Sequence, residues 1–167
     1  GWAWSLYFCH SVLTTCMVQA ECERGVPRHI AEGQVLIDGQ SPPTLGVGRP
    51  IIAPYVDNAN YLGTDDRQVR AAVASLEEVL REKGLAYRVE LEPTSCGDVV
   101  GLTLDVAGRR WRNKSRRTWR MHFAAAALAE RGYCSGEVQR VFNGHAVHLS
   151  GVQPCILSAL ASCFTFA

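Results

Sequence analysis

The stretch IIAPYVDNANYLG, residues 51–63, places a carboxylate and an amide, Asp57 and Asn58, between two short apolar runs. The runs Ile51–Val56 and Ala59–Leu62 predict a β-hairpin with this pair at its tip. Asp and Asn tolerate positive φ and bond their own backbone, so the pair could serve only as a turn. A carboxylate on a rigid hairpin could also present oxygen to Mg²⁺, which prefers octahedral oxygen coordination. Local sequence leaves both interpretations open.

A second candidate site is basic. Residues 109–120, RRWRNKSRRTWR, hold seven of the chain's 17 Lys and Arg residues and no acid. These cations are Arg109, Arg110, Arg112, Lys114, Arg116, Arg117 and Arg120. Clustered cations bind a phosphate backbone, and interleaved Trp side chains can stack on bases, so the pattern predicts contact with nucleic acid. The alternative is a solvated helix start. Trp119 itself is expected in the core, four residues from Phe123.

Other polar residues indicate no chemistry. His145 and His148 are three apart on a predicted helix, but a metal site needs a third ligand and none is close in sequence. We therefore expect packing or capping roles for both. Asp38, in the segment LIDGQ, is expected to belong to a loop turn.

Amino-acid composition indicates which class of protein this is. The 167 residues are 47% hydrophobic and 20% charged with a net charge of +1, which is typical of a globular protein and implies no partner. Seven scattered cysteines without a CxxC pair favour reduced thiols, an intracellular rather than secreted protein, and no zinc framework. Residues 1–20 are apolar, but they lack a basic leader region and include Trp2, Trp4 and His10. We expect no membrane partner.

The elements predicted around both sites indicate an α+β fold. Residues 4–20 read as a buried helix, and the Gly- and Pro-rich residues 21–49 as a loop or insertion. Apolar spacing predicts a helix over 65–83, and alternation predicts strands over 85–92, 99–106 and 109–112, with a turn at 93–98. Helices over 115–131, over 135–149 and from Pro154 onward complete the chain.

In this order the segments resemble the reverse transcriptase, or RNA-directed DNA polymerase, of a retrotransposon. YVDN at 55–58 is similar to that family's YxDD hairpin, and GWAWS at 1–5 to its G-x-x-x-S/A segment. KGLAY at 83–87 resembles the helix-Gly-strand element, and VGLTLD at 100–105 the strand before the primer-grip hairpin. Residues 144–164 are similar to the thumb side. The resemblance implies a partial polymerase palm of antiparallel strands and packed helices over 1–112, with 21–49 as insertion, and a helical thumb-like region over 113–167.

The resemblance also implies a function, a nucleotidyltransferase that uses two metal ions, Mg²⁺ or Mn²⁺. Asp57 would be catalytic as a metal ligand, with Asn58 beside it. Gly1 and Ser5 would contact the incoming nucleotide and template, and Tyr55 would lie beneath the primer end. The implied partners are an RNA or DNA template–primer, a dNTP, and the N-terminal palm and fingers of the same polyprotein.

Several departures from the family pattern limit this expectation, and two of them concern the metal site. Asn58 stands where the family has a second acid, and the family's other metal-binding aspartate belongs before Gly1. We therefore expect this chain alone to be inactive. The alternatives are a non-catalytic nucleic-acid-binding relic of such a polymerase and an unrelated α+β protein.

Overall fold

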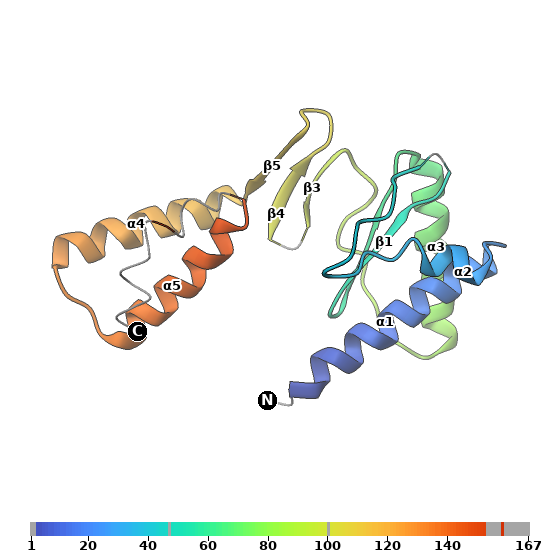
Figure 1. The fold of residues 1–167 in the computed structure, drawn as a ribbon, viewed down its shortest axis with the longest axis horizontal. Coiled ribbons are helices and arrows are strands. Elements are labelled where there is room, and N and C mark those ends of the chain that lie inside the picture. Colours follow the sequence, from blue (N-terminus) through green and yellow to red (C-terminus); the bar gives the residue numbers. More distant parts are fainter. Residues whose placement is uncertain (1–2, 47, 100, 153–157, 159–167) are drawn as a thin grey trace. The chain divides into compact units, whose positions relative to one another are not determined.

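The computed structural model describes residues 3–46, 48–99, 101–152 and 158. Helices and two small antiparallel sheets give it an α+β architecture, as predicted (Figure 1). The chain divides into two compact units, Gly1–Thr94 and Ser95–Ala167. The predicted division between palm and thumb after residue 112 is a functional one and stays a prediction.

The described residues of the first unit form three helices and one hairpin. Its elements are α1 (Ala3–Glu23), α2 (Arg28–Glu32), β1 (Ile51–Tyr55), β2 (Asn58–Leu62) and α3 (Asp66–Glu82). Helix α3 matches the predicted helix. Asp65 caps it by accepting a hydrogen bond from the Arg67 N–H at 2.9 Å, and Ala72, Leu76 and Val79 bury one face.

Helix α1 is buried over only part of its length, which corrects the prediction of a buried helix. Cys16, Met17 and Ala20 in its second half are at most 1% exposed and pack into the core with α3. Trp4, Tyr7 and Phe8 in its first half are more than half exposed. Apolar residues all round a helix predict burial, but the described part of this unit covers only the second half.

The segment 21–49 is more ordered than the predicted loop. It contains the end of α1 and the short helix α2, and residues 34–36 run beside β1. The Ile52 N–H donates to the Gln34 carbonyl at 2.9 Å, and the Leu36 N–H donates to the Ile52 carbonyl at 2.8 Å. The backbone of Ile52 is therefore satisfied on the side away from β2.

No strand forms over 85–92, so that prediction was wrong. All eight residues of this range are exposed, including Leu85, Tyr87, Val89 and Leu91 at 39–48%. Alternation marks a chain able to form a strand, but a strand needs a neighbour to accept its backbone hydrogen bonds. Here the two sheets are completed by other segments.

The second unit begins with a three-stranded antiparallel sheet of β3 (Cys96–Val99), β4 (Leu102–Asp105) and β5 (Arg110–Asn113). The single strand predicted over 99–106 is therefore a hairpin, and the turn predicted over 93–98 already contains the start of β3. Gly101, at φ +85°, turns the chain between β3 and β4. Only glycine adopts that angle without strain, so a strand cannot continue through it.

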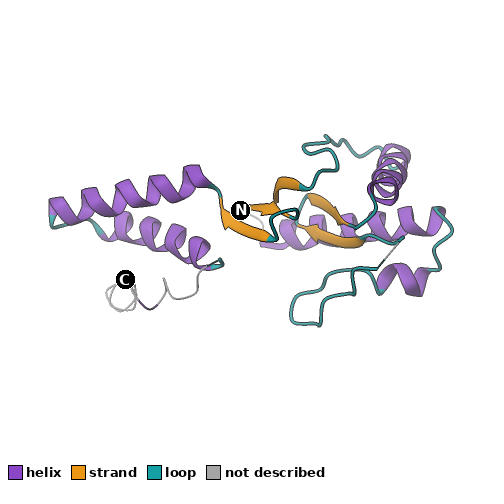
Figure 2. Cartoon of the chain, turned by 90° about the horizontal axis from the view of Figure 1, so that it is seen from above, coloured by secondary structure: helices purple, strands orange, loops and turns teal. Residues whose placement is uncertain are grey.

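Two helices follow, α4 (Ser115–Arg131) and α5 (Gly136–Ser150), which lie side by side (Figure 1 and Figure 2). Both match the predicted spans. Gly132 at φ +74° ends α4, and the Ser135 hydroxyl caps α5 by accepting from the Val138 N–H. The helix predicted from Pro154 lies outside the described residues.

Candidate functional site

The hairpin tip is set by strand register. Tyr55 and Asn58 form the last pair between β1 and β2, so the turn consists of Val56 and Asp57. The predicted turn, Asp57–Asn58, was wrong by one residue: the turn includes Val56 in place of Asn58, because Asn58 pairs with Tyr55. Asn58 instead begins β2. Two-residue hairpin turns need positive φ at the first central residue, and Val56 adopts φ +56°.

Val56 is a strained residue. A β-branched side chain rarely occupies the left-handed region because its Cβ crowds the following carbonyl. Strain of this kind persists only where the surrounding structure holds it, and it often lies beside functional groups. Here it sits directly before Asp57.

Replacing Val56 with glycine is expected to stabilise the first unit by ~1 kcal/mol, because glycine removes the left-handed penalty. Val56→Ala is the matched control: it also trims the side chain but keeps the penalty, so we expect no gain. Urea unfolding together with hydrogen exchange of the hairpin amides measures both variants. An equal gain from alanine would contradict strain at this position.

The polar groups of the tip face solvent. Asp57 and Asn58 are exposed, and Tyr55 is 53% exposed. The Asn58 Nδ2 donates to Asp57 Oδ1 at 3.3 Å. The structure thus brings together Tyr55, Asp57 and Asn58. Ser5 belongs to another element, the exposed first turns of α1, and Gly1 lies outside the described residues.

Packing behind the tip holds it in place. Ile52 on β1 is fully buried in the core formed by α1 and α3. Asn60 on β2 clamps the hairpin, since its Nδ2 donates to the Ala53 carbonyl across the ladder at 3.1 Å. The carboxylate of Asp57 is therefore presented by a supported turn rather than by a free loop.

A buried polar network joins the elements that carry the hairpin. Arg24 Nη1 contacts Glu21 Oε1 at 2.6 Å and Oε2 at 2.8 Å, and its Nη2 donates to Gln68 Oε1 at 2.7 Å. This links α1 to α3. Tyr61 on β2 lies beside it: burial raises the pKa of the Tyr61 phenol, and the charge of Glu21 raises it further. Sequence analysis missed this network, because Glu21 and Arg24 read there as loop residues.

The donors at the tip suit a hard cation. Asp57 offers a carboxylate and Asn58 an amide oxygen, both accessible, and Mg²⁺ takes such ligands together with water and substrate phosphates. Two donors do not complete six-fold coordination. Across residues 3–46, 48–99 and 101–152, no group of three or more His, Cys, Asp or Glu side chains is placed to hold a metal ion.

The basic cluster splits into two halves in the structure. Arg110 and Arg112 lie on β5 opposite Asp105 and Thr103 of β4, and Thr103 in turn pairs with Asp98 of β3. Because alternate residues share a face, these cations stand over a sheet face that also carries carboxylates. Sequence analysis missed those acids. Antiparallel pairing of the flanking strands is the signal that could have found them.

Asp98 contacts both a neighbouring strand residue and a cation of the basic cluster. Its Oδ1 accepts from the Thr103 hydroxyl at 2.6 Å, and its Oδ2 lies 3.2 Å from Lys114 Nζ. The Thr103 hydrogen bond, then that of Lys114, with the charges of Lys114 and Arg112, holds the pKa of Asp98 below its usual value. Lys114 is therefore paired within the protein, and the charge of Arg112 also acts on Asp98.

The helix-borne half differs. Arg116, Arg117 and Arg120 form no ion pair with any described residue. Arg116 and Arg120 are exposed, whereas Arg117 is half-buried and lies toward His148. Burial, followed by the charge of Arg117 and then His145, lowers the pKa of His148. The two halves therefore differ in their acids: Asp98 and Asp105 share the sheet face of Arg110 and Arg112, whereas the first turn of α4 carries no acid.

Trp119 is not in the core, which corrects the prediction. It is 60% exposed, Phe123 is 65% exposed, and no described residue of α4 is buried. Spacing alone could not decide this, because four-residue spacing brings two rings together on a helix whether or not anything covers them.

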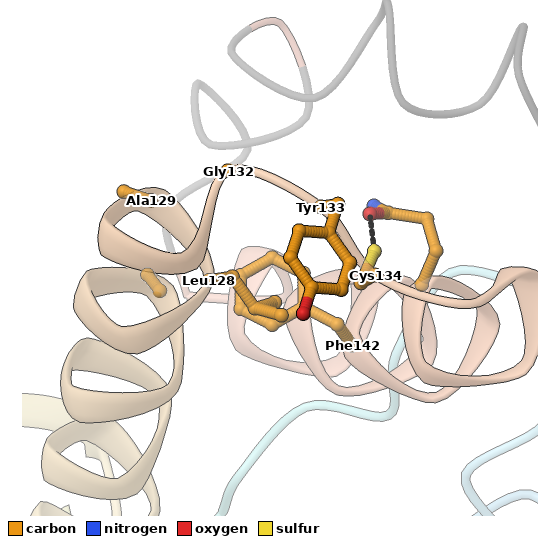
Figure 3. A pocket seen from close by; sticks show the side chains of 8 residues that line it. Leu128, Ala129, Gly132, Tyr133, Cys134 and Phe142 are labelled. Atoms are coloured by element: carbon orange, nitrogen blue, oxygen red, sulfur yellow. Dashed lines mark hydrogen bonds between the residues drawn. The ribbon is translucent and has the colours of Figure 1, made fainter.

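A pocket of about 320 Å³ lies between the end of α4 and α5 (Figure 3). Leu128, Ala129 and Phe142 supply apolar walls, and Tyr133 and Cys134 also line the pocket (Figure 3). The Cys134 thiol donates to Gln139 Oε1 at 3.4 Å. Cys9, Cys16 and Cys22 are free thiols, as is Cys134. This lining carries no charged group that would bind a nucleotide.

No protein-family model matches the chain, and no curated protein and no solved structure is similar enough to count as a match. None of the described helices combines the length and the apolar character needed to cross a membrane.

Proposed function

We propose that the chain is the C-terminal palm and thumb part of an RNA-directed DNA polymerase of a retroelement. The observation that carries the proposal is the hairpin tip. An exposed Asp57 is presented by a strained two-residue turn on a hairpin packed against two helices. The segment YVDN that forms this tip resembles the family's YxDD hairpin, although the strand expected after α3 does not form. The family's second metal-binding aspartate would come from the preceding part of the same polyprotein.

In this proposal each residue of the tip has one task. Asp57 would hold a divalent cation through its carboxylate, Asn58 would offer a neutral oxygen, and Tyr55 would support the primer end. Bound metal ions supply charge neutralisation at the phosphates during attack of the primer 3′-hydroxyl on the α-phosphate of a dNTP, which releases pyrophosphate. The free cations of α4 hold the template–primer backbone.

A second candidate is a nucleic-acid-binding relic without catalysis. Asn58 favours it, because an amide contributes no charge, and its Nδ2 donates to one of the Asp57 oxygens that a cation would need. The basic surface of α4 would serve both candidates equally.

Primer extension tests the proposal. The chain is expressed joined to the preceding segment of its reading frame and given a labelled primer on an RNA or a DNA template, dNTPs, and Mg²⁺ or Mn²⁺. Metal-dependent extension is the expected result. Binding of the template–primer without extension under either metal would support the relic and overturn the polymerase.

The two halves of the basic cluster should differ in their salt dependence. Each phosphate contact contributes about −0.9 to the slope of log K against log salt on duplex nucleic acid. We expect Arg116→Ala with Arg120→Ala to flatten the slope for a template–primer by about 2. The matched control, Arg110→Ala with Arg112→Ala, should change it less, because the carboxylates of Asp98 and Asp105 lie on the same sheet face and repel phosphate there. Fluorescence anisotropy measures both, and equal changes would contradict the division.

A further inference from the structure

One face of α4 combines cations with exposed aromatic rings. Arg116, Trp119, Arg120 and Phe123 are spaced i, i+3, i+4, i+7, so they form a continuous stripe along one side of the helix. The half-buried residues of α4 lie on other positions: Arg117, Met121 and Leu128. We call these four exposed residues the α4 stripe.

The rings of the α4 stripe are arranged as a platform. The Trp119 and Phe123 centroids are 6.1 Å apart, with an angle of 29° between planes, in a stacked arrangement. His122 meets both rings edge-on, at 5.8 Å from Trp119 and 5.6 Å from Phe123. Trp119 is 60% exposed and Phe123 is 65% exposed. Exposed apolar side chains gathered in one patch are typical of an interaction site.

The positive charge around the α4 stripe indicates which kind of ligand it binds. The helix carries no acid in its first turn, and its sequence has none before Glu130. Arg116 and Arg120 flank Trp119 without an ion pair to any described residue. A polyanion that also has flat apolar faces fits this surface. Nucleic acid has both, but in a duplex the base faces are stacked on one another and closed to a protein side chain.

We propose that the α4 stripe binds single-stranded nucleic acid, with an unpaired base stacked on Trp119 and phosphates held by Arg116 and Arg120. The proposal rests on the nucleic-acid contact proposed above and not on polymerase chemistry. Trp111 is not part of this proposed site. It is equally exposed at 60%, but it lies on the sheet face of Leu102 and Leu104, and the arginines of β5 lie on the other face.

The test uses the full chain and fluorescein-labelled 12-nucleotide oligomers, single-stranded or annealed, as DNA and as RNA. We expect tighter binding to single strands than to the matching duplex. Trp119→Ala should weaken single-strand binding ~10–100-fold without changing the salt slope, because stacking releases no counterions. Trp119→Phe should restore most of the affinity. Arg116→Ala should reduce the slope by about 0.7.

Matched controls make the result specific. Trp111→Ala removes an equally exposed indole and should leave binding within about threefold, since a stacking contact contributes more than that. Phe123→Leu keeps the helix apolar but removes the second ring, and should weaken binding in the same direction as Trp119→Ala. Circular dichroism checks that each variant keeps its helix content.

Three outcomes overturn the proposal. Equal affinity for duplex and single strands that is insensitive to Trp119→Ala would mean contact with phosphate alone. An equal loss from Trp111→Ala would mean that the stripe is not the site. A concentration-dependent dimer that Trp119→Ala abolishes would assign the stripe to a second copy of the chain. Absence of primer extension leaves these readouts unaffected, so the two proposals fail separately.

Discussion

Replacing Asp57 with alanine is expected to reduce primer extension at least ~1,000-fold in the polypeptide that includes the preceding segment. A metal ion stabilises transition-state charge by several kcal/mol, and each 1.36 kcal/mol corresponds to a tenfold change in rate. Alanine removes the charged oxygen ligand, while the turn keeps its backbone. Because Asp57 is exposed and its one side-chain hydrogen bond to the described residues is that with Asn58, stability should change little.

Two variants sharpen this prediction. Asp38→Ala removes another exposed loop carboxylate and should leave extension unchanged. Asn58→Asp supplies a second charge at the tip and should preserve or raise activity in Mg²⁺. Steady-state extension rates with saturating primer separate these effects from template binding, which Asp57→Ala should not alter. Extension that survives Asp57→Ala would remove Asp57 from the metal site.

Replacing Arg24 with alanine should destabilise the first unit by about 2–4 kcal/mol, because it leaves the Glu21 carboxylate buried without its cation. The side chain of Glu21 is 5% exposed and that of Arg24 is 16% exposed. Water cannot replace the lost partner there. Urea unfolding measures the loss, and hydrogen exchange of α1 and α3 amides locates it in this unit.

Arg28→Ala is the matched control. Arg28 and Glu32 are 2.8 Å apart, close to the Arg24–Glu21 distance, but their side chains are 75% and 52% exposed. Water screens such a pair, so its loss should be barely measurable. Replacing both Glu21 and Arg24 with methionine should recover most of the stability lost in Arg24→Ala, because no lone charge is then buried. Equal losses in Arg24→Ala and Arg28→Ala would contradict the buried network.

Local patterns predicted the helices well. The 3.6-residue spacing of Ala72, Leu76 and Val79 marked α3, and glycine and serine at the ends marked α4 and α5. These signals act within a few residues, so they can be read before any tertiary contact is known. The strands were predicted less well. The range 85–92 alternates as a strand should, yet it has no partner, while Gly101 divides the predicted strand 99–106.

The candidate sites show the same division. Sequence placed Asp57 at a hairpin tip and collected the cations of 109–120, because residue type and spacing alone determine both features. It could not place the turn at Val56–Asp57, since register depends on which residues pair across the hairpin. The buried contact of Glu21 with Arg24 and Gln68 also escaped it, because Gln68 is 44 residues from Arg24.

The sequence by itself thus determined that this is an α+β protein with one acidic hairpin tip and one basic, aromatic segment. Only the tertiary structure decided which of those cations share a surface with carboxylates. Strand pairing places Asp105 opposite Arg110 and puts Asp98, two strands away, on the same sheet face, whereas no described acid forms an ion pair with Arg116 or Arg120. Exposure of Trp119 was decided in the same way, because burial depends on what packs against a helix and not on the helix alone.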